Sequence, residues 1–276
     1  MSKLADRPVD VSRRIDASAV VALFRMTVAR LVRGRRLVVL ALLFSLPVVF
    51  ALLAQRYSPR YDAEATETIL VFGLIPQTLL PLTALVFASG MIRDEIEEQT
   101  LTYLLIRPLP REAIYLVKLA ATFTVTAVLT TIFTLLTYLV IDWNEPDLWG
   151  EVFPWMPLQT SAAMLLALAA YGSIFALLSV FTSRTLVFGV GYIIIFEGVI
   201  ANIEFVVRKL TIMYQFRVLT IRWLDLKPKD WNIDLTLAPS GTWAGLNLAI
   251  AAVVGAVLGA WFFARREFRL KTPEGA

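Results

Sequence analysis

Long apolar stretches alternate with shorter polar segments along the 276 residues. Six stretches come close to the roughly 20 residues that cross about 30 Å of hydrocarbon as a helix. Only one charged residue, Glu197, falls inside them. This pattern predicts an all-α polytopic membrane protein with six transmembrane helices. The predicted spans lie near 37–54, 69–91, 119–141, 158–181, 186–203 and 242–264.

Composition supports this class and excludes several kinds of site. The chain is 58% hydrophobic, above the usual share for soluble domains. It has no cysteine and no histidine. Disulfides, thiolate or imidazole metal sites and Cys–His or Ser–His catalytic pairs are therefore excluded. We predict no catalytic residue, no metal site and no nucleic-acid partner. The polar, basic first 36 residues give no sign of a cleavable secretory signal.

Basic residues in the loops predict the orientation. With the N-terminus inside, the inner segments hold 18 Lys and Arg and the outer segments hold 8. The positive-inside rule then places both termini in the cytoplasm, as expected for a bacterial-type inner membrane protein. Segment 204–241 is an exception, because it is basic although predicted outside. We expect it to be partly helical and to lie in the outer interface, and we expect the tail, 265–276, to be cytoplasmic.

The cytoplasmic N-terminal region, 1–36, contains a helical pattern over residues 17–34, with one apolar face and several arginines around the other. This pattern predicts an amphipathic helix on the inner leaflet, its arginines directed to lipid headgroups or a partner. The alternative is a cytoplasmic extension of the first span. The apolar face comprises Val20, Leu23, Phe24, Val28 and Leu31, and the basic face Arg25, Arg30 and Arg33.

Segment 92–118 separates spans two and three on the predicted cytoplasmic side. It contains nine charged residues, and Pro108 and Pro110 prevent a continuous helix. We therefore expect a short helix, a turn, and a second helix that begins at Arg111 and leads into span three. Apolar side chains framed by charges suit a protein partner. Packing against the chain's other cytoplasmic ends is the alternative.

The stretch "EEQTLTYLLIRPLPREAIYLVK" resembles the signature of ABC-2-type transporter permeases, Glu–x–Gly–Thr–Leu followed by Leu–Leu, Pro, Arg and Lys. Gln99 stands where the family usually has glycine. The six-span plan and residues 206–219, which retain Tyr214, are also similar to the family. The matching positions are Glu97 or Glu98, Thr100, Leu101, Leu104, Leu105, Pro108, Arg111, Ile114 and Lys118.

The resemblance implies an ATP-driven transporter, with export as the expected direction. Two permeases, identical or homologous, would form the translocation path and bind two cytoplasmic ATPase subunits. The helix over 93–107 would be the coupling helix, and the amphipathic helix a second contact. No G-x-x-x-x-G-K-[ST] phosphate-binding loop is present. The chain is therefore not expected to be an enzyme or to hold a cofactor, and the partner subunit is expected to bind ATP and Mg²⁺. The predicted coupling residues are Glu95, Glu98, Thr100, Leu101, Leu104, Leu105, Arg107 and Arg111.

Glu197 is a candidate site because a carboxylate inside a membrane span is costly. It either lines the translocation path or bonds to local backbone groups where span five breaks. Span six carries glycines with small-xxx-small spacing, which permits close helix approach, either within one subunit or in a dimer. These glycines are Gly241, Gly245, Gly255 and Gly259.

Other functions remain open from the sequence. An ATPase-independent secondary carrier would need coupling-ion residues, and Glu197 alone is thin support for one. An ABC-type mechanotransmission or assembly subunit that moves no substrate is a further alternative. An intramembrane enzyme is disfavoured, because the spans hold no His, Cys or paired carboxylates. Co-purification of an ATPase would separate the carrier from the ABC permease.

Overall fold

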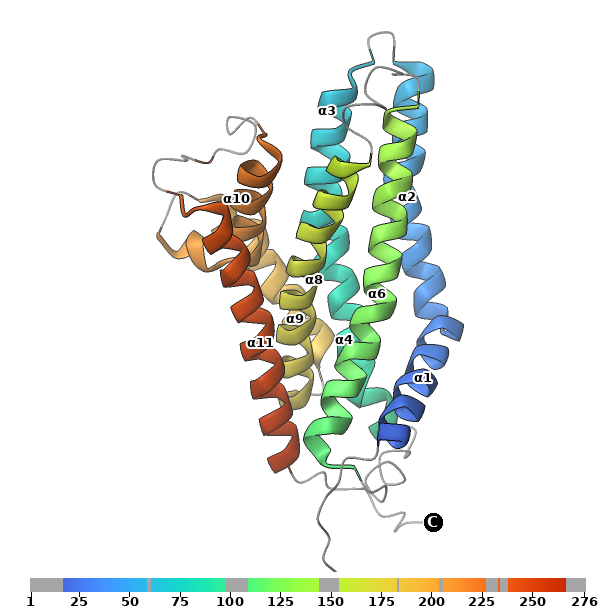
Figure 1. Ribbon diagram of the computed structural model, residues 1–276, viewed down its shortest axis with the longest axis vertical. Coiled ribbons are helices and arrows are strands. Elements are labelled where there is room, and N and C mark those ends of the chain that lie inside the picture. The colour runs from blue at the N-terminus through green and yellow to red at the C-terminus, as the bar shows by residue number, and fades with distance from the viewer. Residues whose placement is uncertain are drawn as a thin grey trace, which may run out of the picture.

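The structure is a computed structural model, and it describes residues 17–58, 61–97, 109–143, 154–182, 184–203, 206–226, 233 and 238–266. The described residues form an elongated bundle of helices without a strand (Figure 1). This confirms the predicted all-α membrane class. Six helical stretches are long and apolar enough to span a membrane: Arg35–Tyr57, Ala63–Ile92, Arg111–Ile141, Trp155–Phe181, Thr185–Asn202 and Gly241–Arg265.

These stretches are built from several kinds of helix. In chain order, the elements are α1 (Ala17–Arg33), α2 (Arg35–Tyr57), α3 (Ala63–Glu67), the π-helix η1 (Thr68–Leu79), α4 (Leu80–Glu97), α6 (Arg111–Ile141), α8 (Trp155–Phe181), α9 (Thr185–Tyr192), the π-helix η2 (Ile193–Val199), the 3₁₀-helices η3 (Ile200–Asn202) and η4 (Val206–Leu210), α10 (Ile212–Leu224) and α11 (Gly241–Arg265).

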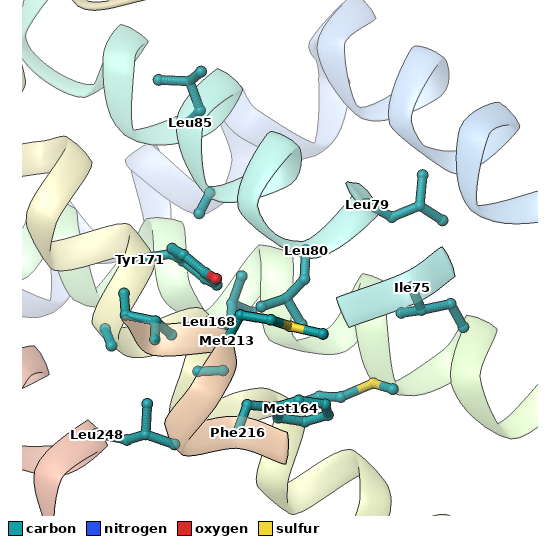
Figure 2. Close-up of a cluster of buried hydrophobic side chains, with 14 of the residues drawn as sticks. Ile75, Leu79, Leu80, Leu85, Met164, Leu168, Tyr171, Met213, Phe216 and Leu248 are labelled. Carbon is teal, nitrogen blue, oxygen red and sulfur yellow. The ribbon is translucent and has the colours of Figure 1, made fainter. Parts of the chain in front are cut away.

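Helix α8 lies at the centre of the bundle and packs against α4, α6, α10 and α11. Its sequence is apolar around its whole circumference, as expected of a helix inside a membrane that faces other helices and hydrocarbon. Figure 2 shows the core around it, where Leu168 and Met164 of α8 lie near Leu80 of α4 and Phe216 of α10. The core thus joins segments from both halves of the chain.

Helix α1 is separate from the first span, because the chain bends at Gly34 between α1 and α2. One position of the predicted apolar face packs against the beginning of α6: Leu23 is buried in a small cluster with Leu109 and Ile114. The other four positions of that face are only partly buried, and further apolar residues of α1, such as Met26, are exposed. The expectation that α1 lies on the inner leaflet stays a prediction.

Spans two and five depart from regular α-helix. In span two, π-helix η1 contains Pro76, which cannot donate a backbone hydrogen bond. In span five, π-helix η2 contains Glu197 and is followed by one turn of 3₁₀-helix. Such wide turns often accompany functional positions in membrane and soluble helices alike.

Helix α10 belongs to the segment predicted to lie in the outer interface. It is helical as expected, but it packs on α8 and α11 and most of its residues are buried. It lies toward the end of the bundle opposite α1 (Figure 1). Its apolar positions extend around most of the helix, so packing into the bundle buries more surface than one interfacial face would.

Candidate functional site

Four helix ends meet at the lower end of the bundle in Figure 1, which we call the coupling end: α1, the end of α4, the start of α6 and the end of α11. Between the end of α4 and the start of α6 the sequence has residues 98–108, which contain most of the predicted coupling residues and lie outside the described residues. Several contacts join the described helix ends to one another.

An ion pair ties the start of α2 to the end of α4. The Arg36 guanidinium donates two parallel hydrogen bonds to the Asp94 carboxylate, of 2.7 and 2.9 Å. Arg36 reaches Asp94 across Gly90, where an added Cβ would stand 1.8 Å from the Arg36 Nη1 atom. Both side chains are partly exposed, so the pair adds little to stability. Its two parallel hydrogen bonds fix the orientation of α2 relative to α4.

A buried lysine ties α4 to α6. The Lys118 ammonium donates a hydrogen bond of 2.9 Å to the carbonyl oxygen of Met91, and the Lys118 residue is only 4% exposed. Met91 lies more than one turn before the end of α4 at Glu97, so this bond reaches a carbonyl inside the helix and fixes α4 against α6. Lys118 matches the lysine of the family signature, and its side chain here is directed to the neighbouring helix.

Arg111 stands in the first turn of α6 and reaches the end of α11. Its Nη1 atom lies 3.4 Å from the carbonyl oxygen of Ala264 and 3.5 Å from that of Arg266. These carbonyls belong to the last turn of α11 and the residue after it. The predicted coupling residue Arg111 therefore joins α6 to α11 within the chain.

The other predicted coupling residues are only partly covered by the structure. Glu95 lies in the last turn of α4, which runs unbroken from Leu80 to Glu97. The coupling helix expected over 93–107 is thus continuous with span two at its beginning, because no helix breaker precedes Pro108 and Asp94 is paired with Arg36. Outside the described residues lie Glu98, Thr100, Leu101, Leu104, Leu105 and Arg107.

Glu197 lies near the opposite end and is 1% exposed. Its Oε2 atom accepts a hydrogen bond of 2.9 Å from the Met213 amide, and its Oε1 atom one of 3.3 Å from the Ile212 amide. The Tyr192 hydroxyl donates a third bond, of 3.2 Å, to Oε1. All three bonds are donated to the side chain, which suits an ionised carboxylate. Glu197 thus binds the first two amides of α10, where the helix dipole favours a negative charge.

A second link joins span five to α10 beside Glu197. The Asn202 amide donates a bond of 2.7 Å to the Gly198 carbonyl, and the Asn202 side-chain oxygen accepts one of 2.9 Å from Arg217. Arg217 is one of the basic residues that made segment 204–241 an exception to the charge rule. The translocation-path role of Glu197 stays a prediction, and within this chain the side chain is covered by α10.

The four glycines of α11 all face neighbouring elements of the same chain. A Cβ added at Gly255 would lie 2.6 Å from the Ser173 Oγ atom, and one at Gly259 would lie 2.0 Å from the Tyr115 hydroxyl oxygen. Close approach to α8 and α6 therefore requires glycine at these two positions. Dimerisation through these glycines stays a prediction. The looser pair faces α10, Gly241 against Arg222 and Gly245 against Leu219.

Sequence reasoning missed the Arg36–Asp94 pair and the role of Gly90. The signal was present, because the start of span one and the end of span two are predicted at the same membrane face with opposite charges. It also missed the partners of Glu197, which come from a segment 15 residues away.

A comparison with family models matches residues 32–202 to the model described as ABC-2 family transporter protein. The match covers more than half of the chain and ends at Asn202, the last residue of span five. The comparison with curated proteins finds no match.

Proposed function

The chain belongs to the ABC-2 family of transporter proteins, and from this premise we propose that it is the permease of an ATP-driven exporter, driven through its coupling end by separate ATPase subunits. It is an integral membrane protein and the membrane component of transport. Export, a complex of two permeases with two ATPases, and coupling through residues 93–107 are the parts that we add.

The arrangement of the coupling end carries this proposal. Residues 98–108 connect α4 to α6, and the neighbouring ends are tied to α2 by Asp94 and to α11 by Arg111. Lys118 joins α4 to α6 directly. A force on the connecting segment would therefore act on four spans together, which is what a docked ATPase requires of its permease.

The orientation and the second permease have supporting observations of their own. Helix α1, the end of α4, the start of α6 and the end of α11 share one end of the bundle (Figure 1), and the loops predicted on that side carry most of the basic residues. We infer that this end is cytoplasmic. Spans one and five are only 22% buried within the chain, against 61% for span two. A second permease, identical or homologous, would cover part of these apolar faces.

Co-purification with an ATPase tests the proposal. We expect an ABC ATPase encoded beside this chain to co-elute with it, and Leu101→Asp or Leu104→Asp to abolish both co-elution and ATP turnover. Leu210→Asp is the matched control, because Leu210 is 83% exposed and lies in the segment before α10. Co-elution unaffected by the Leu101 and Leu104 changes would refute the coupling role, and a chain that transports without any ATPase would be a secondary carrier.

A further inference from the structure

An apolar groove runs between α6 and α11, with α8 as its floor. Its volume is about 270 Å³, and it is lined on the walls by Leu116 and Phe123 of α6 and Val253 of α11. Ala169 and Gly172 of α8 line the floor. Figure 1 shows α6 and α11 diverging from the coupling end with α8 between them. Because all three helices span the membrane, the groove opens into hydrocarbon.

Close contacts join α11 to α6 and to α8 at one end of the groove. Tyr115 of α6 lies against Gly259 of α11 near the coupling end, and Ser173 of α8 lies against Gly255. Beyond these contacts the floor is missing side-chain volume: a Cβ added at Gly172 would meet nothing within 4 Å. Gly255 and Gly259 bring helices together, as small residues usually do in membranes, whereas Gly172 leaves a space.

The groove presents an apolar surface although hydroxyl groups lie in its lining. The Thr126 hydroxyl donates to the Thr122 carbonyl at 3.0 Å, and the Ser173 hydroxyl donates to the Ala170 carbonyl at 2.9 Å. Both hydroxyls are therefore satisfied within their own helices. The Thr122 hydroxyl, also in the lining, is buried and has no hydrogen-bond partner among the described residues. An apolar ligand can fill the groove without leaving the Thr126 and Ser173 donors unpaired.

The dimensions of the groove select its occupant. Its lining on α6 extends from Leu116 to Thr126, about 15 Å at ~1.5 Å per residue, which is half of a hydrocarbon core of about 30 Å. A volume of about 270 Å³ holds on the order of nine groups the size of a water molecule. One turn of a helix about 10 Å wide and about 5.4 Å long takes up on the order of 400 Å³, more than this volume, whereas a stretch of hydrocarbon chain fits within it.

We propose that this groove is a binding site for one acyl chain of a phospholipid, in the leaflet where α6 begins. The site requires that the chain is inserted in a membrane. The proposed function bears on it at one point only: the orientation decides whether this leaflet is the cytoplasmic one. The bound chain fills the space between α6 and α11, so that the pair moves with its lipid as one unit.

Photochemical labelling of the full chain tests the proposal directly. The chain is reconstituted into phosphatidylethanolamine–phosphatidylglycerol vesicles that contain a phospholipid with a diazirine on its acyl chain, and adducts are mapped by mass spectrometry after illumination. We expect several-fold more adducts at Val253, in the groove, than at Val128, on α6 outside it. These two valines are similarly exposed, at 61% and 53%. Equal labelling of the two would overturn the proposal.

Filling the groove provides the matched variant. Gly172→Leu should lower labelling at Val253 several-fold and leave Val128 unchanged, whereas Gly172→Ala, which adds one methyl group, should keep most of it. Ala169→Leu serves the same purpose if Gly172→Leu does not fold. Undiminished labelling in the filled variants would refute the site.

A second copy of the chain is the competing occupant. The chain has no cysteine, so Val253→Cys gives a single thiol. Efficient oxidation of this variant to a disulfide-linked dimer, together with absent lipid adducts, would assign the groove to a protein interface and overturn the lipid proposal. A monomer that keeps its adducts supports the lipid.

Discussion

Replacing Glu197 with glutamine tests whether this carboxylate holds α10 in place. The substitution keeps the shape but turns one acceptor oxygen into an NH₂ donor, which would face a backbone N–H of α10. One charge-assisted hydrogen bond, worth about 1.5–3 kcal/mol, is lost. The favourable interaction with the helix N-terminus, up to about 2 kcal/mol where it is partly buried, is lost as well. Because these contributions overlap, we expect Glu197→Gln to destabilise the chain by about 2–4 kcal/mol.

The measurement is reversible or thermal unfolding of the purified chain in detergent, with Glu112→Gln as the control. Glu112 likewise stands close to a helix N-terminus, in the first turn of α6, but is exposed, so its loss should cost no more than about 1 kcal/mol. In a Met213→Cys background, Glu197→Gln should also speed thiol labelling, because Met213 is 1% exposed in the intact structure. Equal losses for the two glutamines and unchanged labelling would refute the role of Glu197 as the link to α10.

Two further substitutions test other contacts in the bundle. Gly259→Ala should destabilise the chain by about 1–3 kcal/mol, because its methyl group would overlap Tyr115 and overpacking of a core carries that penalty. Gly191→Ala is the control in the same unfolding measurement, because its added Cβ meets nothing within 4 Å. Equal effects of the two substitutions would contradict the packing argument. We expect Asp94→Arg alone to weaken ATPase coupling, and the added Arg36→Asp to restore part of it. Stability should change by about 1 kcal/mol or less in these variants, as expected for a partly exposed pair. A charge swap that restores no coupling would contradict the role of this ion pair.

The membrane class and the six spans follow from the sequence because a bilayer imposes a simple rule. Each span must satisfy its own backbone hydrogen bonds, so length and apolar composition suffice to recognise it. The start of α6 was also readable, since Pro110 ends one element and Arg111 begins the next. The family emerged from the motif around Thr100 and Leu101, and the match over 32–202 bears it out.

Contacts between distant segments could not be read in the same way. The apolar face of α1 looks identical whether it covers lipid or the start of α6, because both surfaces are apolar. Segment 204–241 is basic enough to resemble an interface, and the packing of its helix α10 is seen only in the contacts of α10 with α8 and α11 and in the bonds of Glu197 and Asn202 to α10. Such partners depend on tertiary geometry that periodicity does not encode.

The π-helical part of span two has a consequence for comparing this chain with its relatives. Turns of η1 are closed by i→i+5 bonds, as from the Leu80 amide to the Ile75 carbonyl, so each turn holds more residues than a turn of α-helix. Removing one residue there can convert a wide turn into an ordinary one and leave both flanking faces in phase. The same removal within α6 would rotate everything beyond it by about 100°. Length differences among homologues should therefore collect in η1, and an alignment that forces a gap elsewhere in span two would misplace its buried face.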